Sequence, residues 1–157
     1  MPEVIFPGPE GRLEGRFNPG PRPRAPVAMI LHSHPQAGGT MNNKIVQLLY
    51  KTFVRRGFAT LRFNFRGVGK SQGTFDNGIG ELSDAASALD WVQQIHPEAE
   101  TTWVAGVSFG AWICWTQSSA LAASLSSPIP LSNVPWLLPT PRKLKRSVAK
   151  PRRTKVL

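Results

Sequence analysis

The sequence predicts an α/β fold in which helices cover a mainly parallel sheet. Short apolar runs alternate with segments of helical periodicity between residues 27 and 107, and each run ends in a loop rich in glycine or polar residues. Such alternation requires crossover connections, which place successive strands parallel in one sheet. The 157 residues, 41% of them hydrophobic, are enough for one domain with a single core.

The chain is expected to begin with an antiparallel hairpin. Residues 4–6 and 13–17 are short strand candidates, separated by the turn-rich residues 8–11. Residues 18–26 contain four prolines, which cannot donate to a ladder and so predict an extended connection. Residues 27–31 are apolar throughout, which is typical of a strand buried on both faces.

Two amphipathic helices are then expected, with a strand between them. The first helix begins at Asn42 and presents an apolar face made by Ile45, Leu48, Leu49, Thr52 and Phe53. In residues 58–65, Arg62 and Asn64 alternate with apolar side chains, which predicts a strand that leans toward a polar rim. The second helix follows capping candidates at residues 76–78, and its apolar face is Leu82, Ala85, Ala86, Leu89 and Val92.

The most informative stretch is Gly106-Val107-Ser108-Phe109-Gly110. It ends the apolar strand candidate at residues 101–107 and precedes residues that can begin a helix. A sharp strand-to-helix turn holds its serine in strained backbone geometry with the hydroxyl exposed, and it needs small residues on both sides. The pattern therefore predicts Ser108 as a nucleophile, with Gly106 and Gly110 as the glycines of the elbow.

Three motifs in this order carry a family resemblance: HSHPQAGG at 32–39, NFRGVGKS at 64–71 and GVSFG at 106–110. With them the chain resembles the α/β-hydrolase superfamily, most closely its small dienelactone-hydrolase-like or serine-esterase-like bacterial members, over roughly residues 3–113. The resemblance implies a partial α/β-hydrolase fold whose C-terminal part is missing. It also implies a serine hydrolase that acts on a small-molecule ester, thioester or lactone without a cofactor or metal.

The resemblance further implies roles for individual residues. Ser108 would attack an acyl carbon, and the backbone N–H groups of Phe109 and Gln36 would stabilise the oxyanion. The loop that contains His34, Pro35, Gly38 and Gly39 would then run close to Ser108. In this family an acid and a histidine follow the serine. Here the last acid, Glu100, and the last histidine, His96, both precede it, so this chain carries one residue of the triad.

The composition changes after Ile113. Residues 114–157 contain six prolines, many serines and no acidic residue, and no alternation of strands and helices is expected there. We therefore divide the chain into an N-terminal portion of a hydrolase domain, 1–113, and a tail, 114–157. The tail is interpreted as a truncated or frameshifted reading of a hydrolase, or alternatively as a disordered basic segment.

The net charge of +10 is concentrated in that tail. Residues 1–100 contain 11 Lys+Arg and 9 Asp+Glu, whereas residues 101–157 contain 8 Lys+Arg and no acid. A nucleic-acid partner is therefore not expected of the folded part. One cysteine predicts a cytoplasmic protein, and no apolar run reaches membrane-spanning length. Two other functions stay open. One is a non-catalytic remnant that folds partially or not at all and self-associates through an exposed sheet edge, and the other is a protein whose basic tail binds nucleic acid or acidic membrane.

Other motifs favour structural roles. Residues 67–71 resemble the end of a phosphate-binding P-loop, but that motif requires glycine at position 64, which is asparagine. His32 and His34 could offer two imidazoles to a metal, but no further ligand lies nearby in sequence. Cys114 has no charged neighbour and is expected to be a packed thiol. His96 is expected to place positive charge at a helix C-terminus.

Overall fold

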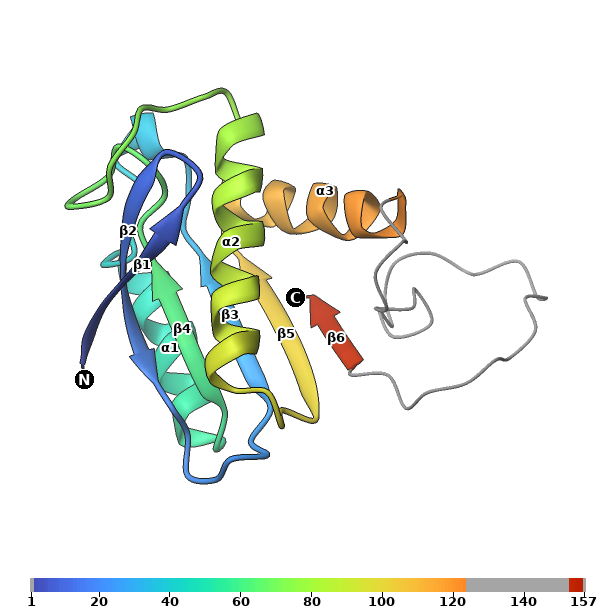
Figure 1. Ribbon diagram of the computed structural model, residues 1–157. Helices are drawn as coiled ribbons and strands as arrows, with labels where there is room; N and C mark the ends of the chain where they lie inside the picture. The colour runs from blue at the N-terminus through green and yellow to red at the C-terminus, as the bar shows by residue number, and fades with distance from the viewer. Residues whose placement is uncertain (1, 124–152, 157) are drawn as a thin grey trace.

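The computed structural model describes residues 2–123 and 153–156 (Figure 1). Its strands are β1 (Glu3–Gly8), β2 (Gly11–Asn18), β3 (Val27–Leu31), β4 (Ala59–Phe63), β5 (Thr101–Gly106) and β6 (Arg153–Val156). Its helices are α1 (Lys44–Arg55), α2 (Ile79–Ile95), α3 (Phe109–Ala123) and a 3₁₀ turn, η1 (Pro35–Ala37). The predicted order of hairpin, strand, helix, strand, helix, strand and helix is confirmed.

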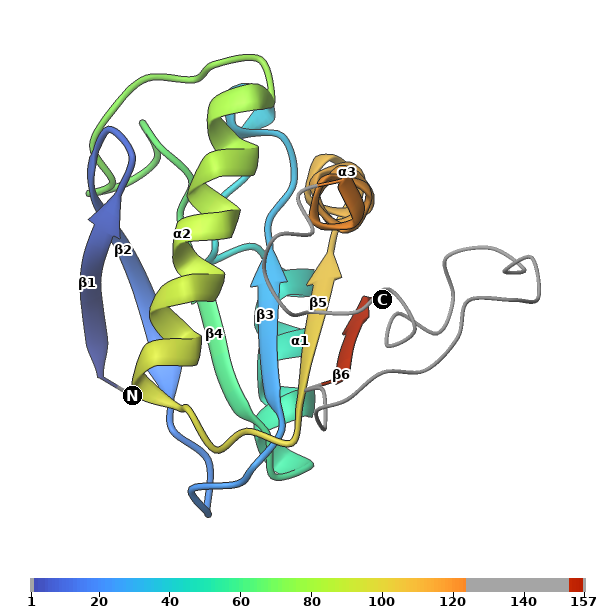
Figure 2. The same cartoon turned by 45° about the vertical axis from the view of Figure 1, so that its right-hand side comes forward.

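The strands form one sheet in the order β1-β2-β4-β3-β5-β6. β1 and β2 form the predicted antiparallel hairpin, and β2 pairs antiparallel with β4. β4, β3, β5 and β6 are parallel, so their C-terminal ends lie at one edge, the upper edge in Figures 1 and 2. The predicted α/β class with a mainly parallel sheet is therefore confirmed.

Helices cover both faces of the sheet (Figure 2). α2 and α3 contribute Ala85, Ala88, Leu89, Val92, Ile113 and Cys114 to a core that also contains buried side chains of β1 to β5. On the opposite face, α1 contributes Val46, Tyr50 and Phe53 to a second core with Ala28, Ile30 and Ala105. β3 faces both cores, which explains why all five of its residues are apolar and buried.

The polar-rim prediction for the strand that contains Arg62 is wrong. β4 pairs on both sides and all five of its residues are buried. The Arg62 guanidinium lies 5.1 Å from the centre of the Tyr50 ring, and Nη1 donates to Met41 O at 2.6 Å and to Asn42 Oδ1 at 3.1 Å. The sheet tolerates a charge here because the cation reaches acceptors beyond the strand.

The predicted apolar face of α1 is partly wrong. Ile45 and Leu48 are 57% and 60% exposed, whereas Val46, Tyr50 and Phe53 are buried. Apolar side chains cover more than half of this helix's circumference, so periodicity alone could not select the stripe that packs on the sheet. For α2 the predicted face is largely confirmed, since Ala85, Leu89 and Val92 are buried.

The structure continues past Ile113. α3 extends to Ala123, so the expected boundary between domain and tail falls inside a helix. β6 pairs in parallel with β5, from Thr101 opposite Arg153 to Val104 opposite Val156. The rest of the predicted tail, residues 124–152 and 157, lies outside the described residues. In the part of the chain that is described, no helix is long and apolar enough to cross a membrane.

Candidate active site

Three loops meet at the carboxyl edge of the parallel strands, and they contain the three sequence motifs (Figure 1). β3 lies between β4 and β5, so the loop after β3 occupies the centre of this edge. The turn after β5 is tied to it, because the Val107 N–H donates to Leu31 O at 3.1 Å. Residues 32–39, 64–71 and 106–110 are therefore neighbours in space.

The turn between β5 and α3 holds Ser108 in the left-handed region, with φ of 53°. Ser108 and Asn77 are the two non-glycine residues with positive φ among those described. Ser108 is an exposed residue, and its backbone carbonyl accepts the Trp112 N–H at 3.1 Å as α3 begins. Left-handed backbone is unfavourable for a serine, so the surrounding contacts must impose it.

The two glycines that flank Ser108 allow those contacts. A Cβ on Gly106 would collide with the backbone of Gly110, and a Cβ on Gly110 would collide with the carbonyl oxygens of Leu31 and His32. α3 thus begins directly against the end of β3. Both glycines are required by close backbone approach, which is the reason for which the pattern predicted them.

His32 is a structural residue of this edge. Its ring is fully buried, Nε2 accepts the Phe65 N–H at 3.1 Å, and Nδ1 lies 2.7 Å from Ser33 O. The two partners assign the proton to Nδ1, because Nε2 faces a donor. Burial lowers the pKa of His32 from 6.5 to about 4. The ring therefore joins the loops after β3 and β4 as a neutral imidazole, and neither nitrogen is free for a metal.

His34 organises the loop after β3. Its Nδ1 accepts the Gln36 N–H at 3.2 Å and so caps η1, while its carbonyl accepts the N–H groups of Ala37 and Gly39, each at 3.0 Å. The Gly38 N–H donates to Pro35 O at 3.2 Å. Every backbone N–H from residue 36 to residue 39 is thus donated within the loop. The Gln36 N–H, predicted as an oxyanion donor, is engaged in this conformation and would have to leave Nδ1 to act.

Aromatic rings line the region next to Ser108. The Phe109 ring centre lies 4.9 Å from that of His34, 5.9 Å from those of Phe65 and Trp112, and 6.1 Å from that of Phe75. His34 and Phe75 are also 4.9 Å apart. His34, Phe75 and Phe109 are half-buried and Trp112 is exposed. We call His34, Phe75, Phe109 and Trp112 the aromatic wall; it offers an apolar surface beside the serine.

The loop that carries Phe75 is held by buried charges that the sequence reading missed. Arg66 and Asp84 form a buried pair, with Nη2 2.8 Å from Oδ1, and Asp84 also accepts the Arg66 backbone N–H at 2.9 Å. The pair raises the pKa of Arg66. Glu81 is buried at the start of α2 and accepts the N–H groups of Asp76 and Gly78 at 3.0 and 2.7 Å. The N-cap residue is Gly78, one of the predicted capping candidates, and the Glu81 side chain, the third residue of the helix, accepts its N–H.

Residues 67–71 do not form a phosphate site. Lys70 Nζ donates to Glu3 at 2.7 Å, and the Lys70 backbone N–H donates to the buried Glu14 carboxylate at 2.7 Å. The Ser71 hydroxyl donates to Asn64 O at 2.7 Å and accepts the Glu14 N–H at 3.0 Å. The groups that would meet phosphate are engaged within the fold, which agrees with the structural interpretation of this loop.

The remaining candidate groups are structural. Cys114 is buried, and burial raises the pKa of its thiol to about 12, so the prediction of a packed thiol is confirmed. His96 stands at the C-cap of α2, as predicted, where it is buried with Nε2 unpaired among the described residues. Within residues 2–123 and 153–156 no three His, Cys, Asp or Glu side chains gather to hold a metal ion.

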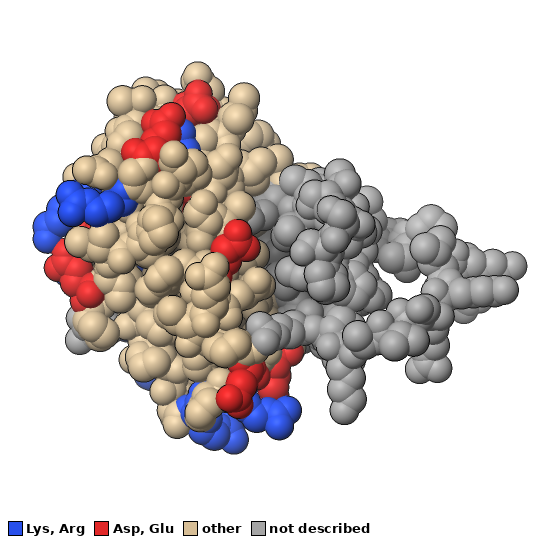
Figure 3. Space-filling model, viewed as in Figure 1, with Lys and Arg blue, Asp and Glu red and all other residues tan. Residues whose placement is uncertain are grey.

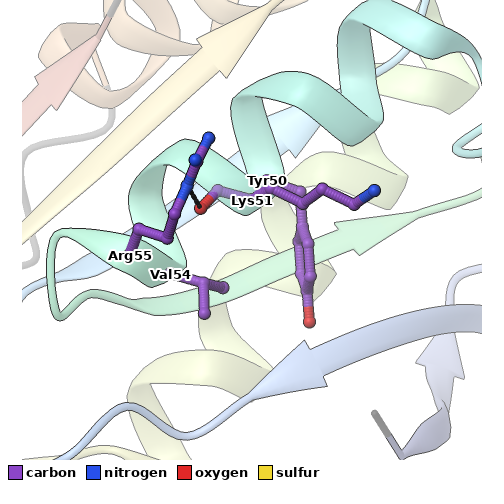
Figure 4. Close-up of a pocket in the computed structure, with 4 residues that line it drawn as sticks. All are labelled: Tyr50, Lys51, Val54 and Arg55. Carbon is purple, nitrogen blue, oxygen red and sulfur yellow. Dashed lines mark hydrogen bonds between the residues drawn. The ribbon is translucent and has the colours of Figure 1, made fainter.

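A hollow on α1 is separate from these groups. Tyr50, Lys51, Val54 and Arg55 line it, and the Arg55 Nε donates to Lys51 O at 3.3 Å beside it (Figure 4). None of its lining residues belongs to the three motifs. The candidate active site is therefore assigned to the loops at the sheet edge and to the aromatic wall, and not to this hollow.

Comparison with known proteins agrees with this geometry. The sequence model of the X-Pro dipeptidyl-peptidase (S15) family matches residues 18–134, past the point at Ile113 where the resemblance was expected to stop. The uncharacterized protein RP471 of Rickettsia prowazekii is 56% identical over 113 residues, which are 72% of this chain and 48% of RP471.

Solved structures resemble the chain as well. Atu1826 of Agrobacterium tumefaciens, a protein of unknown function assigned to the α/β hydrolases, is 64% identical with a TM-score of 0.74; the match covers 76% of this chain and 55% of Atu1826. An α/β serine hydrolase homologue from Coxiella burnetii is 40% identical with a TM-score of 0.69, over 79% and 58% of the two chains. XC6422 of Xanthomonas campestris, an α/β serine hydrolase without a lid, is 34% identical with a TM-score of 0.70, over 77% and 56%. The chain spans about half the length of these relatives.

Proposed function

The chain belongs to the α/β-hydrolase-type X-Pro dipeptidyl-peptidase (S15) family, and on that premise we propose that Ser108 is the nucleophile of a serine hydrolase that cleaves ester-type bonds. The observation that carries the proposal is the exposed Ser108 at φ of 53°, held between glycines whose backbone packs against the end of β3. An exposed hydroxyl in imposed left-handed geometry is what an elbow nucleophile needs. The substrate is proposed to be a small-molecule ester, thioester or lactone in the cytoplasm.

Ser108 Oγ would attack the acyl carbon, and the developing oxyanion would accept the N–H of Phe109. That N–H is in the first turn of α3, where backbone donors have no intrahelical acceptor and the helix dipole favours negative charge. Removing one such donor typically costs about 3 kcal/mol of transition-state stabilisation. The aromatic wall would contact the apolar part of the acyl group or of the leaving group.

The sequence holds no Asp, Glu or His after Ser108, so a base of the usual kind is missing from this chain. A serine without its base is a weak nucleophile, but oxyanion stabilisation and binding alone can leave about 10³-fold acceleration over water. We therefore propose slow acylation at Ser108 for this chain, with the complete triad belonging to proteins of the relatives' length.

Labelling with a fluorophosphonate probe tests the proposal. Intact-mass and peptide analysis should find one phosphonyl group on Ser108, and Ser108→Ala should abolish it. Ser83→Ala is the matched control, since Ser83 is an exposed serine on α2, and it should label as the wild type does. Absence of labelling, or labelling that persists in Ser108→Ala, would overturn the proposal. The hydrolysis rates of a p-nitrophenyl ester and of an X-Pro p-nitroanilide by the unlabelled chain then separate ester substrates from peptide-type substrates.

The alternative of nucleic-acid or acidic-membrane binding rests on the basic tail, of which residues 124–152 and 157 lie outside the described residues. On the described part of the face shown in Figure 3, basic and acidic side chains lie side by side. Glu3 pairs with both Arg16 and Lys70, and Arg24 lies 3.7 Å from Glu100. Deleting residues 142–157 should remove any salt-dependent binding of DNA, and this experiment distinguishes a function of the tail from a hydrolase activity.

A further inference from the structure

The loop between β3 and α1 uses its predicted oxyanion donor, the Gln36 N–H, and the three following N–H groups internally. The N–H groups of Gln36, Ala37, Gly38 and Gly39 all donate to acceptors on His34 or Pro35. Pro35 has no N–H. His34 receives three of these four bonds, and its side chain is the donor of this loop that we consider next.

The side chain of His34 has a defined tautomer. Its Nδ1 accepts the Gln36 N–H, so in the neutral ring the proton lies on Nε2. No described residue forms a hydrogen bond with Nε2. The ring is half-buried between Phe75 and Phe109, whose ring centres are each 4.9 Å away. An N–H donor is thus held in a fixed plane by one hydrogen bond and two aromatic contacts.

The residue that carries this donor contacts the turn of the proposed nucleophile through Phe109, whose ring centre lies 4.9 Å from that of His34. Phe109 directly follows Ser108, and the Gly110 backbone packs against the carbonyl oxygens of Leu31 and His32 at the start of the same loop. The Val107 N–H also donates to Leu31 O at 3.1 Å, so the end of β3, where the loop that carries His34 starts, contacts the turn on both sides of the serine. A preorganised donor at such a position stabilises developing negative charge without reorganisation.

We propose that the imidazole Nε2–H of His34 is a catalytic oxyanion donor, which acts together with the backbone N–H of Phe109. The proposal rests on the assignment of Ser108 as the nucleophile. The same tautomer argues against His34 as a substitute base for Ser108: a basic Nε2 would require a proton on Nδ1, which would then face the Gln36 N–H donor. The substrate class that fits is an ester or thioester whose carbonyl oxygen points toward His34 while its apolar part lies on the aromatic wall.

Two substitutions separate the functions of the two ring nitrogens. In His34→Asn, the side-chain oxygen can still accept the Gln36 N–H and cap η1, but the distal donor is lost. In His34→Gln, the longer side chain places an amide N–H near the position of Nε2. The full-length chain is treated with a fluorophosphonate, whose phosphoryl oxygen occupies the place of the oxyanion, and the second-order labelling rate at Ser108 is measured.

His34→Asn should lower that rate by about tenfold or more, with the thermal unfolding midpoint retained, and His34→Gln should recover most of the loss. Equal rates in wild type and His34→Asn would overturn this inference and leave a backbone N–H as the donor, while Ser108-dependent labelling would still support the proposed hydrolase. If the wild type is not labelled at Ser108, both proposals fall.

A second measurement needs no variant. In the phosphonylated wild-type chain, ¹⁵N-edited NMR should show the Nε2 of His34 protonated and its proton shifted downfield relative to the unlabelled chain. An Nε2 without a proton, or a proton whose shift does not change on phosphonylation, would refute the contact.

Discussion

The stability of the fold should depend on pH through His32. Its ring is fully buried and neutral, and burial lowers its pKa from 6.5 to about 4. In the unfolded chain the same ring binds a proton below pH 6.5, so the unfolded state holds more protons between pH 6.5 and 4. The contribution of the neutral His32 to the unfolding free energy is therefore fully present above pH 6.5 and is lost as the pH falls toward 4.

The magnitude follows from linkage. Each unit of pKa difference corresponds to about 1.4 kcal/mol, so His32 alone should cost about 1.4 kcal/mol of unfolding free energy at pH 5.5 and about 2.5 kcal/mol at pH 4.5, relative to pH 7.5. Carboxylates titrate in the same range and add to the total. The contribution of His32 is therefore measured as the difference in unfolding free energy between two chains that share those carboxylates.

His32→Gln is the comparison chain, because the amide does not titrate and its oxygen can still accept the Phe65 N–H. At pH 7.5 it should be less stable than the wild type by about 1–3 kcal/mol, the usual cost of disturbing a buried hydrogen bond. Urea unfolding at pH 7.5, 6.5, 5.5 and 4.5 should show this gap narrowing toward acid pH. Ser83→Ala, which keeps every histidine, should follow the wild-type pH profile. Parallel profiles for wild type and His32→Gln would refute the assignment of a neutral buried imidazole.

Three further predictions concern packing around the same edge. Gly110→Ala should destabilise the fold by several kcal/mol or prevent folding, because its Cβ would meet carbonyl oxygens at the end of β3. Gly38→Ala, with open space around the new Cβ, should cost only about 1 kcal/mol for the positive φ of this residue. Chemical denaturation measures both losses of stability, and equal losses would contradict the steric argument. Asp84→Ala should cost about 3–5 kcal/mol, because it removes the buried partner of Arg66 and leaves only the half-exposed Glu10, 3.3 Å away. A thermal midpoint within two degrees of wild type would show that the pair is not buried in solution. Cys114 should resist a thiol reagent at pH 8 in the native chain and react at once in urea, since its thiol is buried with a pKa of about 12; rapid native labelling would exclude that packing.

The order of elements could be predicted because periodicity is a local property of the sequence. Residues 27–31 are apolar at every position, and a strand buried on both faces between β4 and β5 is the structure that accommodates them. The face of α1 could not be predicted in the same way. Ile45 and Leu48 are as apolar as Val46 and Phe53, and the stripe that packs on the sheet also contains Tyr50, whose contact with Arg62 of β4 is not a local property of the sequence.

The turn at Ser108 was predictable, and the hydrogen bonding of the loop next to it was not. The motif around Ser108 encodes its own turn, since the two glycines, the serine and their spacing are all local. Whether the Gln36 N–H is free or bonded depends on the orientation of the His34 ring, and the spacing of residues in the sequence does not determine that orientation. Arg66 and Asp84 are 18 residues apart on a loop and a helix, so their pairing required the fold itself.

The geometry of Ser108 is maintained by residues of this half-length chain alone. A left-handed serine costs roughly 1–2 kcal/mol, and it persists only where packing over-determines it. The groups that impose it are the backbone of Gly106, Gly110 and the end of β3, together with the Val107 N–H bond to Leu31. All of them precede or adjoin the serine, and none belongs to the part of the relatives that the chain does not span. The turn does not require a downstream acid or histidine to form. Slow labelling of Ser108 would therefore measure what this geometry and its oxyanion donors contribute when the general base is missing.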